Sequence, residues 1–114
     1  MNIATTLQDL VDALQAADVS AALEASKVRA PGVWVTLDRL PATGYTLGRG
    51  GIVRVRLFLV VEERDARRSL EALQALYDQV EAVVDPTSDV EAASLDLPDR
   101  PGLPALVFTT DLPA

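Results

Sequence analysis

The chain of 114 residues contains neither cysteine nor histidine. Without cysteine there are no disulfides and no thiolate nucleophiles, and without histidine the side chain that ordinarily titrates near neutral pH is missing. The two absences together argue against the usual zinc sites and against serine hydrolase chemistry with a histidine base. We therefore expect no enzymatic activity, no metal and no cofactor.

Long apolar runs are missing as well. The longest, Leu57 to Val61, has five residues, whereas a helix that crosses a bilayer needs about 20. The first fifteen residues carry Asp9 and Asp12 but no basic residue, which is unlike a signal peptide. These features predict a protein that remains in the cytoplasm, or in an assembly built there, and that does not enter a membrane.

The composition is that of a globular domain with a large negative charge. Hydrophobic residues make up 49% of the chain and charged residues 24%, and the length suits one domain over residues 1–114. The net charge of −7 is uneven: residues 1–63 hold six basic and seven acidic side chains, and residues 64–114 hold four and ten. Unlike halves could join copies of the chain head to tail; the alternative is uneven scatter on a solvated surface.

Hydrophobic periodicity predicts a helix near the N-terminus. Leu7, Leu10, Val11 and Leu14 follow the helical spacing i, i+3, i+4 and i+7. Ile3 extends this stripe backwards, and Thr6 is a candidate N-cap. For residues 18–29 we prefer a short edge strand near 19–23 followed by an irregular turn, with a helical continuation as the rival.

Alternation of apolar and polar residues then predicts a long hairpin. After Pro31-Gly32, residues 33–38 alternate, and residues 52–63 carry the strongest strand pattern in the chain. In that second strand one face is apolar, while Arg54 and Arg56 lie on the other. The intervening residues 41–51 are rich in glycine and predict a protruding loop.

A second helix is expected over residues 66–84, with Asp65 as its N-cap. Its predicted buried stripe consists of Leu70, Leu73, Tyr77, Val80 and Val84. Two further strands are expected near residues 90–97 and 103–110. The chain thus predicts an α+β domain: a mostly antiparallel sheet of four to five strands with two helices packed on one face.

Two clusters are candidate sites of chemistry. Residues 48–51 form a glycine cluster, but a strand follows it, where a phosphate-binding loop needs a helix, so a hairpin loop is the better interpretation. Glu62, Glu63 and Asp65 form an acidic cluster suited to acid–base work or a divalent ion. Asp65 is already explained as a cap, and no base lies nearby in sequence.

The charged residues suggest surfaces rather than a reaction centre. Arg49, Arg54 and Arg56 form either a nucleic-acid patch or a solvated or subunit-facing stripe, and the aromatic content of 4% favours the second. On the second helix, Arg67 and Arg68 lie in the first turn. Three acidic residues crowd its far end: Asp78, Glu81 and Asp85. This order opposes the helix dipole, so either a partner surface or chance sets these charges, and an Arg67–Glu71 contact would recover part of the cost.

Several of these segments resemble tail-terminator proteins of long-tailed (siphovirus-type) actinobacterial bacteriophages. The resemblance lies in Pro31-Gly-Val-Trp-Val-Thr-Leu-Asp38, in Leu47-Gly-Arg-Gly-Gly51, and in the strand 53–61 with the following Asp65-Ala-Arg-Arg-Ser-Leu-Glu-Ala-Leu73. It covers most of the chain and depends on element order, length and these phrases.

The resemblance implies a structural virion protein. Such proteins are small α+β domains that form a ring, a hexamer in the family, on the last ring of tail-tube subunits. The ring ends tube polymerisation and offers a surface to head-completion proteins, and DNA passes through it. We expect Leu47 and Arg49 at a ring contact or near the channel. The loop is not strongly basic, so no specific DNA binding is expected.

For the ring contact we expect Arg49, Arg54 and Arg56 of one copy to face Asp78, Glu81 and Asp85 of the next. Two other functions stay open from the sequence. One is a head-closure or connector protein of the same phage neck, which would bind the portal or its adaptor. The other is a small non-enzymatic ligand-binding α+β domain, which would enclose an apolar pocket.

Overall fold

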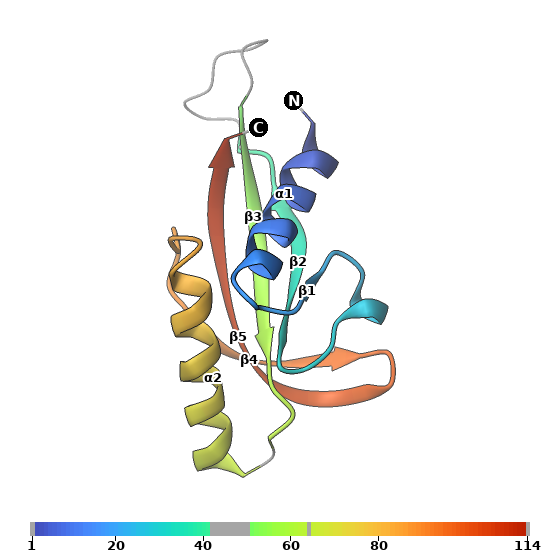
Figure 1. Cartoon of the computed structure of the whole chain (residues 1–114), viewed down its shortest axis with the longest axis vertical. Helices are drawn as coiled ribbons and strands as arrows, with labels where there is room; N and C mark the ends of the chain where they lie inside the picture. The colour runs from blue at the N-terminus through green and yellow to red at the C-terminus, as the bar shows by residue number, and fades with distance from the viewer. Residues whose placement is uncertain (1, 42–50, 64, 114) are drawn as a thin grey trace.

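A computed structural model describes residues 2–41, 51–63 and 65–113. It confirms the expected fold class, an α+β fold with a five-stranded, mostly antiparallel sheet (Figure 1). Along the chain the elements are α1 (Ile3–Ala16), β1 (Ala21–Ala22), the 3-10 helix η1 (Ala25–Lys27), β2 (Gly32–Arg39), β3 (Ile52–Val60), α2 (Ala66–Glu81), β4 (Glu91–Leu97) and β5 (Arg100–Pro113).

The strands lie in the order β1-β2-β3-β5-β4. Among the described strands, β1 alone runs parallel to its neighbour, and the other pairs are antiparallel. Both α-helices pack on one face of this sheet, and their apolar stripes meet the side chains that β3 directs to that face, such as Val55, Leu57 and Leu59. We call this side the helix face and the other the open face.

The first helix begins at Ile3, the residue that extends its apolar stripe backwards, and not after Thr6. Its N-cap is Asn2, whose side chain accepts a hydrogen bond of 3.0 Å from the N–H of Thr5. Thr6 is therefore not the cap; its hydroxyl donates to the carbonyl of Asn2 at 2.9 Å. Asp18, with φ of 63°, lies just beyond the helix end, and the chain then enters the short strand β1, so the strand alternative holds for this segment.

The hairpin of β2 and β3 has the predicted faces. Val35 pairs with Leu57 on the helix face, and Trp34 pairs with Phe58 on the open face. The two rings stack with centroids 5.2 Å apart. Most of the expected loop 41–51 lies outside the described residues.

The buried stripe of α2 differs from the prediction. Leu70 is 67% exposed, whereas Leu76 is 5% exposed and Ser69 7%. The hydroxyl of Ser69 donates to the carbonyl of Ala66 at 3.0 Å, which lets this polar residue be buried. Asp65 is the N-cap, as predicted, with its carboxylate 3.1 Å from the N–H of Arg68.

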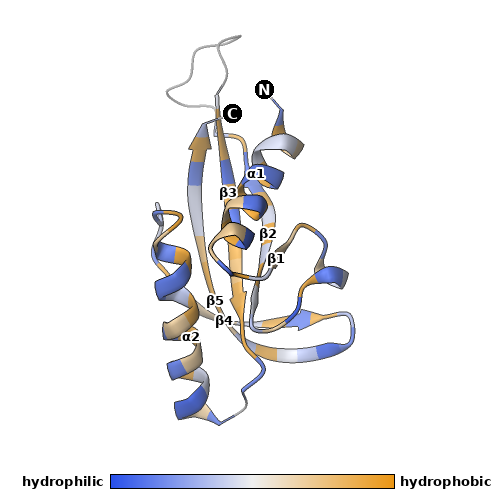
Figure 2. Ribbon diagram, viewed as in Figure 1, coloured by the Kyte–Doolittle hydropathy of each residue, from blue (hydrophilic) through white to orange (hydrophobic). Residues whose placement is uncertain are grey.

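Within residues 2–41, 51–63 and 65–113, the open face is covered at one end. There the hairpin of β4 and β5 curls across the molecule (Figure 1), and its Leu95 and Leu103 form a second apolar cluster with Val28 and Val60. Figure 2 shows the apolar colour concentrated along β3, the central strand, while both helices alternate between apolar and polar faces. The remainder of the open face carries charged side chains.

Candidate subunit and partner interface

Five of the seven residues predicted to lie at an interface belong to the described part of the chain. They are Arg54 and Arg56 on β3, Asp78 and Glu81 on α2, and Asp85 after α2. The other two, Leu47 and Arg49, lie outside it.

Arg54 is held within the chain by Asp111. The two residues are direct cross-strand partners of β3 and β5. Nε of Arg54 lies 2.8 Å from Oδ1 of Asp111, and Nη2 lies 3.2 Å from Oδ2. This bidentate geometry is the strong form of an arginine–carboxylate pair. The hydrogen bond from Arg54 lowers the pKa of the Asp111 carboxyl below its ordinary value.

Arg56 is held by Asp38. The β2–β3 register shifts between Leu37 and Arg39, and the extra residue of this bulge, Asp38, receives a hydrogen bond from Nη2 of Arg56. Nε of Arg39 is 3.1 Å from the other carboxylate oxygen, and the Asp38 side chain is only 4% exposed. A partner that uses Arg54 or Arg56 must therefore compete with, or add to, an intramolecular carboxylate. Sequence reasoning missed Asp38 and Asp111, because only the register brings them to the arginines.

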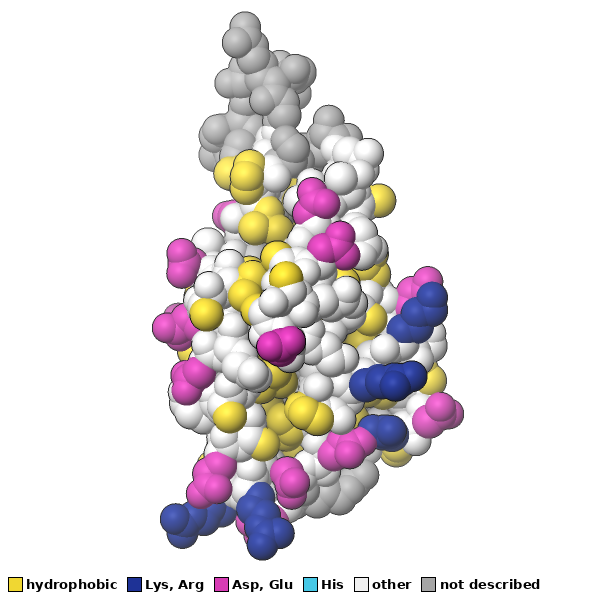
Figure 3. All heavy atoms as spheres, viewed as in Figure 1, with side chains coloured by type: hydrophobic (Ala, Val, Ile, Leu, Met, Phe, Trp, Pro, Cys, Tyr) yellow, Lys and Arg dark blue, Asp and Glu magenta, His cyan; other side chains and the backbone are white. Residues whose placement is uncertain are grey.

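The acidic candidates form what we call the acidic flank: Asp78, Glu81 and Asp85, all exposed. From residue 69 to residue 99 the sequence has eight acidic residues and no basic one, and among the described residues only Glu71 of the eight has an ion pair, with Arg67 at 3.2 Å. Figure 3 shows acidic side chains spaced along the side of the molecule where α2 lies, with Lys and Arg at its lower end. Burial, and then a hydrogen bond with Glu81, raise the pKa of Tyr77 next to this flank.

The sheet has two open edges near the chain termini. β1 pairs with β2 only at Val33 and Trp34, so within the described chain residues 35–39 have β3 on one side and no strand on the other. We call these the β2 edge. β4 pairs with β5 only as far as Val107. The C=O and N–H of Thr109 bond to Thr87 and Ser88 at 2.8 and 2.9 Å.

Residues 110–113, the β5 edge, have no described strand beyond them. At this end the described sheet is therefore three strands wide, β2-β3-β5, and both of its sides are open (Figure 1).

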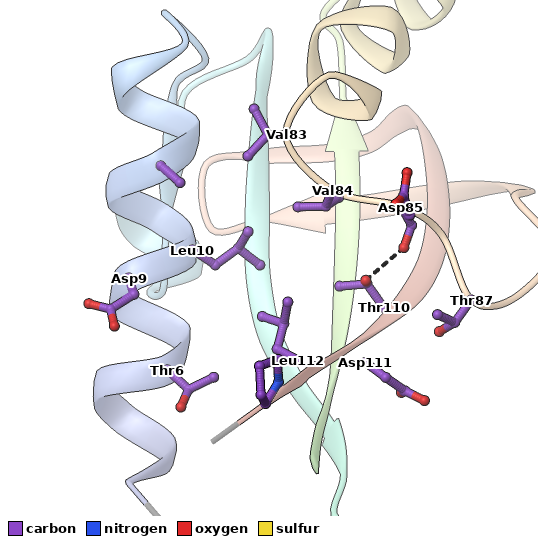
Figure 4. A pocket seen from close by; sticks show the side chains of 12 residues that line it. Thr6, Asp9, Leu10, Val83, Val84, Asp85, Thr87, Thr110, Asp111 and Leu112 are labelled. Carbon is purple, nitrogen blue, oxygen red and sulfur yellow. Dashed lines mark hydrogen bonds between the residues drawn. The ribbon is translucent and has the colours of Figure 1, made fainter.

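A groove adjoins the β5 edge on the helix face. It has a volume of about 630 Å³ and lies between α1 and the segment after α2, with Thr110 and Leu112 of β5 in its wall. Figure 4 shows Leu10 on one side and Val83 and Val84 on the other, with the hydroxyl of Thr110 bonded to the carbonyl of Asp85 at 2.7 Å. The groove is mostly apolar and open to solvent.

The other acidic cluster has structural roles. Glu62 forms an ion pair with Arg100, and Asp65 caps α2. Within residues 2–41, 51–63 and 65–113, no group of three or more potential metal ligands comes together. No helix in the same part of the chain is long and apolar enough to cross a membrane.

Comparison with known proteins adds no family. No model of a known protein family matches the chain, and no curated protein is significantly similar to it.

Proposed function

We propose that this chain is a tail-terminator subunit of a long-tailed bacteriophage: a structural virion protein that forms a ring on the end of the tail tube. The ring ends tube polymerisation and gives head-completion proteins a surface to bind. DNA passes through the ring without specific binding.

The element order carries this proposal. The resemblance rests on a helix, a hairpin with a glycine-rich loop, a second helix and a second hairpin, and the described elements follow one another in that order. An α+β fold of this size is what the resemblance implies.

The charge distribution supports the same proposal. Asp78, Glu81 and Asp85 stand at the end of α2 that the helix dipole makes unfavourable for acids, and no described basic side chain pairs with them. A charged surface that does not serve the stability of its own helix is suited to contact another protein.

Assembly with the tail-tube protein of the same phage tests the proposal. Purified tube protein is polymerised with and without the chain, and tube lengths and ends are examined by negative-stain electron microscopy. We expect shorter tubes that carry a cap at one end. Tubes of unchanged length without the chain at either end would contradict the proposal, and binding to the portal or its adaptor instead would assign the chain to head closure.

A further inference from the structure

We propose that copies of this chain join by strand addition, with the β5 edge of one copy pairing in parallel with the β2 edge of the next. This inference rests on the self-assembly in the proposed function and names the surfaces that perform it. The occupant of each open edge is a second copy of the same chain.

Strand direction and hydrogen-bonding groups both suit this pairing. β2 and β5 are each antiparallel to β3, so they run parallel to one another. The N–H of Val33 donates to Ser20 at 2.8 Å, away from β3. Backbone groups alternate along a strand, so Val35 and Leu37 direct theirs the same way.

The β5 edge offers the matching groups. Thr109 bonds outward to residues 87 and 88, so Asp111, two residues on, also directs its N–H and C=O outward. With Asp111 opposite Thr36 of the neighbour, its N–H donates to the C=O of Val35, and its C=O accepts from the N–H of Leu37.

In this register, the side chains of paired residues lie on the same face of the sheet. Thr36 and Asp111 both lie on the open face, since they pair with Arg56 and Arg54 of β3. On the helix face the register places Leu37 of one copy beside Leu112 of the next. Leu37 is 42% exposed in the single chain, and Leu112 forms part of the apolar groove of about 630 Å³. One edge thus carries an exposed apolar side chain, and the other has an apolar space for it.

A pairing of two different edges does not stop at a dimer. Each added copy leaves one β2 edge and one β5 edge free, so growth continues as an open filament unless the rotation between copies closes a ring. Pairing two β5 edges with each other would instead run antiparallel and end at two copies, and Leu37 would stay exposed. The contact between unlike edges is therefore the one that fits a ring.

Disulfide trapping tests the register, because the chain has no cysteine of its own. Neighbouring strands lie about 4.8 Å apart, within the range of Cα separations that a disulfide bridges. The Leu37→Cys and Leu112→Cys variants are mixed at about 1 mM total protein, oxidised mildly and separated on non-reducing gels. We expect at least tenfold more cross-linked heterodimer than in a control mixture of Leu37→Cys with Leu70→Cys, which is equally apolar but lies on α2.

Partial burial of Leu112 makes a second pair useful. If Leu112→Cys unfolds, Thr36→Cys with Asp111→Cys probes the same register from the open face. Cross-linking no higher than in the control mixture, for the folded pair, overturns the inference.

A charge at the β2 edge tests its role on the tail. We expect Leu37→Lys to weaken capping of tail tubes at least tenfold, while Leu70→Lys leaves it unchanged. If wild type and Leu37→Lys cap tubes equally, the edge pairing is overturned and the proposed function stands. If wild type does not cap tubes at all, the proposed function itself fails, and cross-linking then decides the edge pairing separately.

Discussion

Glycine is required at two positions for different physical reasons. A Cβ on Gly32 would lie 2.2 Å from the carbonyl oxygen of Arg29, a backbone atom that has little freedom to move. Gly102 has open space around it, but its φ of +68° is one that side chains with a Cβ rarely adopt. Steric exclusion acts at the first site and backbone conformation at the second.

We expect Gly32→Ala to lower the free energy of unfolding by about 1–3 kcal/mol, the usual cost of forcing extra atoms into a packed site. Gly102→Ala should cost about 1–2 kcal/mol, from its left-handed conformation alone. Asparagine tolerates that conformation, so Gly102→Asn should recover part of the loss, whereas Gly32→Asn should not. Urea unfolding followed by the fluorescence of Trp34, the single tryptophan, measures all four variants. Equal effects of Asn at the two sites would contradict this explanation.

The Arg54–Asp111 pair predicts a pH dependence of stability. Because Arg54 lowers the pKa of Asp111 in the folded chain, the pair contributes fully above the ordinary Asp value of about 3.9, and the contribution disappears as pH falls through the lower folded value. The side chains are 32% and 22% exposed, so solvent screens the pair and we expect about 1 kcal/mol.

Unfolding of wild type and Arg54→Met as a function of pH measures this contribution. The difference between their free energies of unfolding should be constant from about pH 5 to pH 7 and should shrink below about pH 4. Asp111→Asn removes the titrating group, so the difference between wild type and this variant should shrink over the same pH range. A difference that stays constant into strong acid would rule out Asp111 as its source.

Among the elements, α2 shows most directly where sequence and structure diverge. Two stripes are possible on this helix, and both contain Leu73 and Val80. The apolar residues favour the stripe with Leu70, but the fold buries the one with Leu76 and Ser69. A serine at a core position is invisible to hydrophobic periodicity, since its burial depends on a bond to the backbone of its own helix.

We expect Leu76→Ala to cost about 2–5 kcal/mol, because it removes a nearly buried side chain from the core. Leu70→Ala removes the same atoms from a side chain that is 67% exposed, and it should change the stability by less than about 0.5 kcal/mol. Thermal and urea unfolding of the two variants compare chemically identical changes on one helix. A larger loss for Leu70→Ala than for Leu76→Ala would show that the helix packs through the sequence-predicted stripe.

The strands were more predictable than the helix faces. Alternation of apolar residues with Arg54 and Arg56 predicted both faces of β3, because a strand has period two and a slip of one residue would expose the whole apolar set. The partners of its arginines were not predictable in the same way. Asp38 reaches Arg56 through a bulge, and Asp111 reaches Arg54, 57 residues earlier in the sequence, through the pairing of β5 with β3. The local pattern of apolar and polar residues predicts neither the bulge nor the long-range register.

In the whole molecule, the open strand edges and the acidic flank lie on different parts of the surface. The longest dimension is 48 Å against 25 and 24 Å, and the described strands β2 and β5 run to one end of this axis with open edges. The acidic flank lies along α2 on one side. If the open edges join copies of the chain, the flank stays available for a different, basic partner, and the tail-tube and head-completion proteins are the ones that the proposed function supplies.

A flank that serves a partner should reduce the stability of the isolated chain. Glu81 is the last residue of α2, where the helix dipole disfavours a carboxylate by about 0.3–1 kcal/mol at low ionic strength. We expect Glu81→Gln to raise the free energy of unfolding by about this amount, since the amide keeps a polar group beside Tyr77 without the charge. The gain should disappear near 1 M salt, where the screening length is only about 3 Å.

Glu91→Gln, on β4 and away from any helix end, is the matched control and should gain less at low salt. Differential scanning calorimetry at low and high salt separates the two variants. If Glu81→Gln stabilises the chain and weakens capping of tail tubes, the charge is kept for assembly at the expense of the fold; if it does neither, the acidic flank is only a solvated surface.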